Sequence, residues 1–102
     1  MSKYRSRVQV VDGVRFASQK EARRYMELKL LQRAGEIADL KLQPRIKCIV
    51  AGELVCTYVA DFFYIPRGKL PVYEDVKGVR TPMYKLKKKL VKACAGVEIF
   101  ET

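Results

Sequence analysis

Two acidic residues and one lysine in the middle of the chain have the types and the spacing for phosphodiester chemistry. Asp61 lies in an apolar stretch, residues 58–64, and Asp75 and Lys77 are two positions apart in the segment 72–77. Two neighbouring carboxylates repel each other unless a divalent cation lies between them, and Mg²⁺ takes oxygen ligands while keeping several waters. Such an ion can hold a phosphate and acidify an attacking water, and a nearby lysine can stabilise the developing charge. These residues predict hydrolysis of phosphodiesters with Mg²⁺ or Mn²⁺, provided that the fold brings them together.

The N-terminal third of the chain predicts a hairpin followed by a helix. Asp12-Gly13 lies between two short apolar segments, which is a strong signal for a two-residue hairpin turn. Ser18 and Glu21 have the spacing of a capping box, which opens a helix. Gly35 follows the last helical residue and is expected to end the helix. We expect the first seven residues to form a separate, flexible basic tail and residues 8–102 to form a single domain.

The rest of the chain predicts three strands, a second helix and a last short strand. Thr81 and Pro82 are typical of a helix start, and Gly96 ends that helix. The short connections make the three strands an antiparallel meander, whereas the second helix provides a crossover to a parallel last strand. We therefore expect an α/β (α+β) fold with a mixed β-sheet. The predicted strands cover residues 37–48 with a break near Pro44, residues 54–64, residues 70–77 and residues 97–100.

The register of the central strands decides which acids meet. Side chains alternate along a strand, so Asp75 and Lys77 share one face and Glu74 takes the other. A slip of one residue would turn Glu74 toward the site instead of Asp75. Antiparallel pairing sets late residues against early ones, so Asp61 meets Asp75 only if the strands bend or are offset. The sequence leaves this register open.

These motifs, in this element order, resemble the PD-(D/E)XK nuclease superfamily, whose core is α-β-β-β-α-β. Ala60-Asp61 corresponds to its first motif, with alanine in place of a proline that performs no chemistry, and Asp75-Val76-Lys77 corresponds to its second. Further segments are similar to a family of small phage and prophage proteins in that superfamily. The resemblance implies an αβββαβ restriction-endonuclease-like core preceded by an N-terminal β-hairpin. The segments that carry it are residues 11–16, 18–22, 42–44, 58–62 and 75–78.

The resemblance implies a Mg²⁺- or Mn²⁺-dependent endonuclease for DNA, selective for branched structures such as Holliday junctions. Asp61 and Asp75 would bind the metal, and the Val76 carbonyl would contribute. Glu21 matches a glutamate that many members carry on the first helix, and it would be a direct or outer ligand. Lys77 would act on the attacking water. Glu21 has a second interpretation as a helix cap, which is compatible with the first.

The charge of the chain favours an anionic partner. Lys and Arg number 21 against 11 Asp and Glu, which gives a net charge of +10. Five lysines without an acid among them lie between positions 85 and 92, and we expect them to contact phosphates rather than form only a solvated face. The predicted DNA-binding residues are Lys85, Lys88, Lys89, Lys92, Arg5 and Arg7.

Composition also excludes some kinds of site. The chain has no histidine, which rules out histidine acid–base catalysis and metal sites that contain histidine. Cys48, Cys56 and Cys94 include no Cys-x-x-Cys pair, so we expect free thiols in a reducing compartment. Cys48 and Cys56 could face each other across a hairpin. No signal peptide and no apolar run of membrane-spanning length is present, so we expect a cytoplasmic protein, in a bacterial host cell if a phage encodes it.

Three further expectations concern core, assembly and alternatives. Tyr25, Met26 and Leu28 are predicted to lie in the core, and the second helix carries a predicted apolar stripe. A homodimer is expected because symmetrical junctions and duplexes suit twofold assemblies. The alternative function is a non-catalytic nucleic-acid-binding protein on the same fold, and a remoter one is a basic protein bound to a membrane surface or a ribosome. The predicted apolar stripe of the second helix consists of Met83, Leu86, Leu90 and Ala93.

Overall fold

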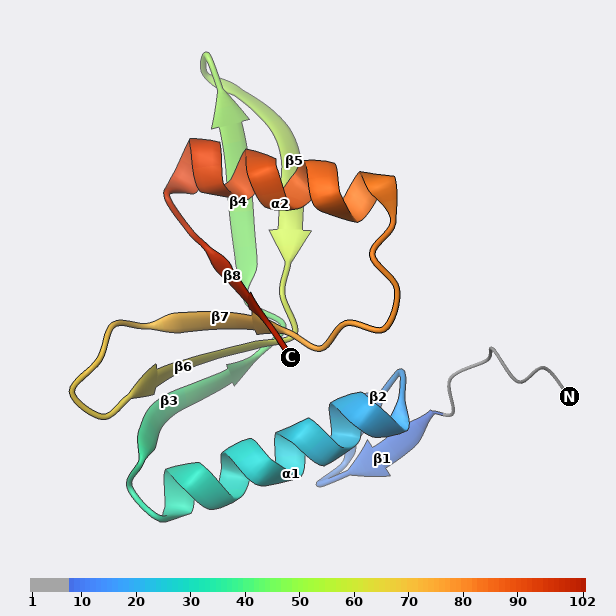
Figure 1. The fold of residues 1–102 in the computed structure, drawn as a ribbon, viewed down its shortest axis with the longest axis vertical. Helices are drawn as coiled ribbons and strands as arrows, with labels where there is room; N and C mark the ends of the chain where they lie inside the picture. The colour runs from blue at the N-terminus through green and yellow to red at the C-terminus, as the bar shows by residue number, and fades with distance from the viewer. Residues whose placement is uncertain (1–7) are drawn as a thin grey trace, which may run out of the picture.

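A four-stranded mixed sheet lies at the centre of the computed structural model, which describes residues 8–102 (Figure 1). The strands follow the order β3-β6-β7-β8. The first two pairings are antiparallel, and β7 pairs with β8 in parallel. The predicted mixed sheet, with a parallel last strand after a helical crossover, is therefore confirmed. The strands are β3 (Ile37–Leu42), β6 (Phe62–Pro66), β7 (Val72–Asp75) and β8 (Ile99–Glu101).

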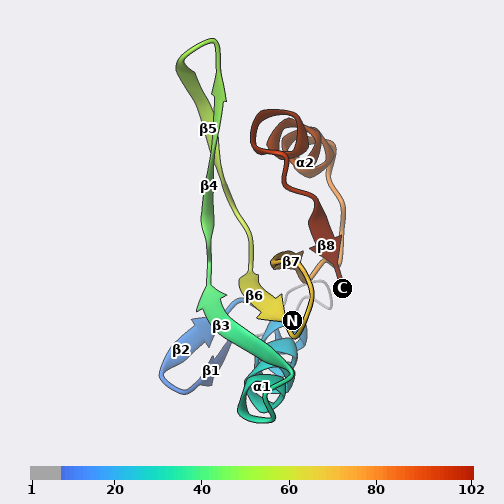
Figure 2. The same cartoon turned by 90° about the vertical axis from the view of Figure 1, so that its left-hand side faces the viewer.

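The two longest predicted strands are each divided by a bend. The predicted strand 37–48 becomes β3 and β4 (Arg45–Val50), and the predicted strand 54–64 becomes β5 (Glu53–Val59) and β6. Both bends lie at the same level, because the N–H of Ala60 donates to the Pro44 carbonyl and the N–H of Gln43 donates to the Asp61 carbonyl. Beyond the bend, and within residues 8–102, β4 and β5 pair only with each other, as a hairpin that leaves the plane of the sheet (Figure 2).

The N-terminal elements form as the sequence predicts. β1 (Gln9–Val11) and β2 (Val14–Phe16) pair as an antiparallel hairpin, whose turn has positive φ at Asp12 and Gly13. Such a turn matches the twist of the two strands. In α1 (Gln19–Arg33), the Ser18 side chain accepts a hydrogen bond from the Glu21 N–H, and Gly35 follows the C-cap with a φ of 79°.

The two helices pack on two separate groups of buried side chains. α1 packs on β1, β2, β3 and the sheet, whereas α2 (Pro82–Ala95) crosses the hairpin β4–β5 (Figure 1). No helix within residues 8–102 is both long enough and apolar enough to span a membrane. The cluster under α1 is Phe16, Ala22, Tyr25, Leu28, Ile37, Phe62 and Tyr64, and the cluster under α2 is Ile46, Cys48, Tyr58, Ala60, Val91 and Ile99.

Part of the predicted core is wrong. Met26 is 46% exposed, although Tyr25 and Leu28 beside it are buried. On α2, Met83 and Leu86 of the predicted stripe are each 60% exposed. Ala93 of the stripe is exposed as well, whereas Leu90 packs against the buried cluster. The physical reason is that α2 covers a narrow hairpin through Val91 and its neighbours, and this contact leaves Met83, Leu86 and Ala93 facing solvent.

Candidate active site

Asp61 and Asp75 meet at one end of the two inner strands of the central sheet, where β6 begins and β7 ends. Phe62 lies opposite Glu74 in the antiparallel register, which brings the next pair, Asp61 and Asp75, together. The Asp61 N–H donates to Asp75 Oδ1 at 3.0 Å, and the Val76 N–H donates to Asp61 Oδ2 at 2.8 Å. The bend before Asp61 lets a new strand, β6, begin at the next residue, so an early position in β6 faces a late position in β7. This bend resolves the register that the sequence leaves open.

The Asp75 carboxylate is buried and fixed from two sides. Its exposed fraction is 1%, Oδ1 accepts the Asp61 N–H, and Oδ2 accepts a hydrogen bond from the Tyr58 hydroxyl on β5. Burial and this hydrogen bond raise the pKa of Tyr58, so the phenol stays protonated and donates. Each oxygen of Asp75 keeps a second lone pair for a further partner.

Lys77 lies next to these acids. Its Nζ is 3.7 Å from Asp75 Oδ2 and 4.3 Å from the centroid of the Tyr84 ring. Its backbone is held as well, because its N–H donates to the Thr102 carbonyl and its carbonyl accepts from Lys20 Nζ at 3.0 Å. The acid-x-Lys segment thus presents one carboxylate and one amine on the same side of the sheet.

Glu21 brings a third carboxylate from the first turn of α1. Its backbone N–H donates to Ser18 Oγ, so the helix cap uses the backbone of this residue. Burial raises the pKa of the Glu21 carboxyl, and the charge of Asp61 raises it further while Lys77 opposes the rise. Burial also raises the pKa of Asp61, the hydrogen bond from Val76 opposes this, and Asp75 adds to it. The predicted cap is present, and the carboxylate lies close enough to the other acids to repel them.

The carboxylate oxygens of this site are the type of ligand that a hard divalent cation prefers. Within residues 8–102, no three acidic, cysteine or histidine side chains are grouped so that they could hold a metal ion. Mg²⁺, however, is usually held by one or two carboxylates, with waters and substrate phosphates completing the shell. Asp61 and Asp75 form such a pair. Burial raises the pKa of Asp61 and repulsion by Asp75 adds to the rise, and a cation between the two carboxylates would relieve that repulsion. Val76 contributes its N–H to Asp61, and its carbonyl stays a predicted ligand.

Two cavities are lined by residues that adjoin the acid pair. One, of about 360 Å³, is lined by Lys77, Tyr58, Tyr84 and Lys87, among others. The other, of about 290 Å³, is lined by Glu21 and includes Arg15 and Gln43. Lys77 lines the first cavity and Glu21 the second, so each cavity adjoins the acid pair through one of these two residues.

A family model described as "Protein of unknown function (DUF1064)" matches residues 1–95. The chain belongs to the DUF1064 family. No curated protein matches the chain, and no solved structure does. The matched residues of this DUF1064 protein include every site residue that the sequence predicts.

The predicted DNA-binding lysines of the DUF1064 protein line one groove beside the acid site. Its volume is about 390 Å³, and Arg80 and Tyr84 contribute to it. Some of its cations are paired: Lys88 lies 3.4 Å from Glu101, and Lys92 lies 3.0 Å from Glu98. Arg5 and Arg7, also predicted to bind DNA, lie outside the described residues. The four lysines that line the groove are Lys85, Lys88, Lys89 and Lys92.

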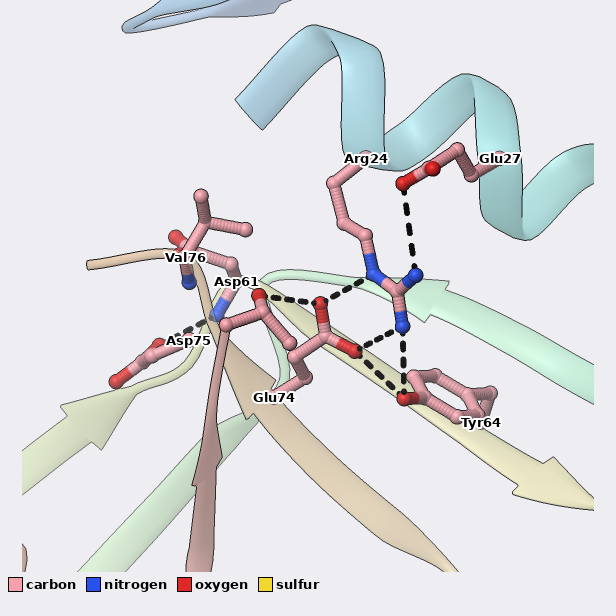
Figure 3. Close-up of polar contacts among 8 residues, drawn as sticks. Arg24, Glu27, Asp61, Tyr64, Glu74, Asp75 and Val76 are labelled. Carbon is pink, nitrogen blue, oxygen red and sulfur yellow. Dashed lines mark hydrogen bonds and ion pairs between the residues drawn. The ribbon is translucent and has the colours of Figure 1, made fainter. Parts of the chain in front are cut away.

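Glu74, which a one-residue slip of the strand would turn toward the site, instead makes contacts on the opposite face of the sheet. Its carboxylate is fully buried and pairs with Arg24 on α1 at 2.7 and 2.9 Å, as Figure 3 shows. The Tyr64 hydroxyl and the Thr102 hydroxyl also donate to it. These contacts connect Glu74 to other elements of the fold. Asp75, not Glu74, faces Lys77.

Sequence reasoning missed the two tyrosines of the site, Tyr58 and Tyr84. Tyr58 is three positions before Asp61, a spacing that puts the two on opposite faces of an unbroken strand. Because the chain bends at Ala60, the Tyr58 hydroxyl and the Asp61 N–H both reach the Asp75 carboxylate. The available signal for Tyr84 was its place in the first turn of a helix that begins soon after Lys77.

Proposed function

We propose that this DUF1064 protein is a metal-dependent endonuclease that hydrolyses phosphodiester bonds in DNA, with a site of the PD-(D/E)XK type. The order α1, β3, β6, β7, α2, β8 supports this, because it corresponds to an α-β-β-β-α-β core with the hairpin β4–β5 added between the first two core strands. The observation that carries the proposal is the hydrogen-bonded contact between Asp61 and Asp75, with the Lys77 amine 3.7 Å from Asp75.

Each residue has a role that follows from its environment. Mg²⁺ or Mn²⁺, when bound, polarises the phosphate and lowers the pKa of an attacking water. Asp61 and Asp75 would hold the ion, and backbone N–H groups together with Tyr58 keep their carboxylates oriented. The Lys77 amine would orient the water and stabilise charge on the phosphate. Glu21 would hold a metal-bound water or bind the ion directly.

The groove of lysines beside α2 would bind the DNA backbone, as would Arg5 and Arg7. A branched substrate and a homodimer belong to the same proposal, since twofold assemblies suit symmetrical junctions. We place this activity in the cytoplasm, in a bacterial host cell if the gene is from a phage. A non-catalytic nucleic-acid-binding protein is the second candidate, because the groove needs no metal to bind phosphates.

A cleavage panel tests the proposal. Purified protein is incubated with linear, nicked, flap and four-way DNA in Mg²⁺, Mn²⁺ or EDTA. We expect metal-dependent cutting that Asp75→Asn and Lys77→Ala each reduce by about 100-fold or more, with DNA binding retained. Asp39→Asn and Lys69→Ala are matched controls, because both change an exposed residue away from the acid pair and are expected to cut normally. DNA that stays intact in all forms with both metals would favour the binding protein.

A further inference from the structure

We propose that Tyr84 is the positioning residue for Lys77, and that its ring holds the lysine amine beside Asp75. The catalytic consequence rests on the proposed nuclease function, whereas the contact itself does not. Lys77 lies in the irregular segment between β7 and α2. Its backbone is fixed by hydrogen bonds, but its four-carbon side chain is flexible and needs further contacts to hold the amine in one place.

The Tyr84 ring provides such a contact. Lys77 Nζ lies 4.3 Å from the ring centroid, well within the distance at which a cation is attracted to an aromatic face. The amine also lies 3.7 Å from Asp75 Oδ2, which is longer than a hydrogen bond. The ring therefore covers one side of the amine, and the buried carboxylate attracts it from another.

Tyr84 is itself fixed by contacts at the start of α2 and with β8. The Tyr84 N–H donates to the Thr81 side chain in the first turn of α2, and its hydroxyl donates to Glu101 Oε2 on β8 at 2.5 Å. Glu101 is held in turn by Arg80 at 2.8 Å and by Lys88 at 3.4 Å. Burial and the Glu101 hydrogen bond raise the pKa of Tyr84, which keeps the phenol protonated as a donor.

This arrangement separates what the ring does from what the hydroxyl does. Tyr84→Phe keeps the aromatic face toward Lys77 but removes the hydrogen bond to Glu101. Tyr84→Leu removes both while keeping an apolar side chain in the helix. A positioning role predicts that phenylalanine restores most of the function that leucine loses, whereas a role of the hydroxyl predicts that both variants are equally impaired.

The first experiment measures the contact without any assay of activity. Lysines are reductively methylated with ¹³C, and the Lys77 signal is assigned by its loss in Lys77→Arg. We expect its methyl resonance to be displaced upfield by the ring in the wild type and in Tyr84→Phe, and to move to the position of an exposed lysine in Tyr84→Leu. The Lys69 signal should stay unchanged as an internal control. A Lys77 signal that is already at the exposed position in the wild type would overturn the proposal.

The second experiment measures the consequence for cleavage at saturating DNA and Mg²⁺. We expect Tyr84→Leu to lower kcat by about tenfold, Tyr84→Phe to stay within about threefold of the wild type, and Tyr84→Leu to have no further effect in a Lys77→Ala background. A loss in the Lys77→Ala background as large as in the wild type would show a structural role instead. Wild-type protein that cuts nothing, although its Lys77 signal is displaced, would refute the nuclease and leave the contact standing.

Discussion

Arg24 on α1 and Glu74 on β7 form a bidentate ion pair, with Nε 2.7 Å from Oε2 and Nη2 2.9 Å from Oε1. Glu74 is buried, and Asp75 beside it points to the other face of the sheet, toward Tyr58 and Lys77. The alternation of a β-strand thus gives two adjacent acids different environments. One ties the sheet to α1, and the other remains for the candidate active site (Figure 3).

Removing the cation of this pair should destabilise the fold. Arg24→Met leaves a buried carboxylate without its charge partner, which typically costs about 3–5 kcal/mol. We expect a clear drop in the urea midpoint of unfolding. Arg23→Met is the matched control, because Arg23 is exposed one position away, and it should change the free energy of unfolding by less than about 0.5 kcal/mol. Equal midpoints for the two variants would contradict a structural role for Glu74.

The burial of the site acids, together with their mutual repulsion, should appear as a pH-dependent stability. The folded-state pKa values of Asp61 and Glu21 are raised, so the folded protein binds protons more tightly than the unfolded chain. Their ionisation therefore lowers stability as pH rises above the ordinary values near 4, and the penalty is complete above the raised values. Asp61→Asn and Glu21→Gln should raise Tm at pH 7 in EDTA and gain little at pH 4. A gain of the same size at both pH values would exclude this origin.

A divalent cation should stabilise the protein in the absence of DNA. A ligand that binds only the folded state adds about 2.7 kcal/mol at one hundred times its Kd. We expect Mg²⁺ or Mn²⁺ to raise the Tm of the wild type and of Asp39→Asn, but not that of Asp75→Asn, measured by thermal unfolding against an EDTA baseline. A rise that Asp75→Asn retains would move the ion to another site.

The element order could be predicted because local signals agree with the tertiary structure. Ser18, Gly35, Thr81 and Gly96 mark the ends of both helices where the structure has them. The sequence also named Asp61 and Asp75 as candidate metal ligands from their types and motif positions, but it left open whether the two residues meet. These signals are local, and they determine which elements exist.

The contacts of the site depended on two bends that no local signal fixes completely. Pro44 indicated a break in the first long strand, but nothing comparable marks Ala60, whose N–H donates to the Pro44 carbonyl across the two bends. The hairpin β4–β5 formed by these bends determines which face of α2 is buried. For that reason the exposure of Met83 and the approach of Tyr58 to Asp75 could not be read from periodicity.

The groove beside α2 should bind DNA through specific lysines rather than through net charge alone. Lys85 and Lys89 are exposed and line it, so the double variant Lys85→Ala/Lys89→Ala should neutralise two fewer DNA phosphates. The slope of log affinity against log salt should then decrease by about 0.9 for each phosphate that is no longer neutralised. Lys47→Ala/Lys69→Ala removes the same charge from exposed positions outside the groove and should leave the slope nearly unchanged. Fluorescence anisotropy across a salt series, with EDTA present to prevent cleavage, gives both slopes. If the two double variants lowered the slope equally, the interaction would follow the overall charge of the protein, and the groove would have no special part in it.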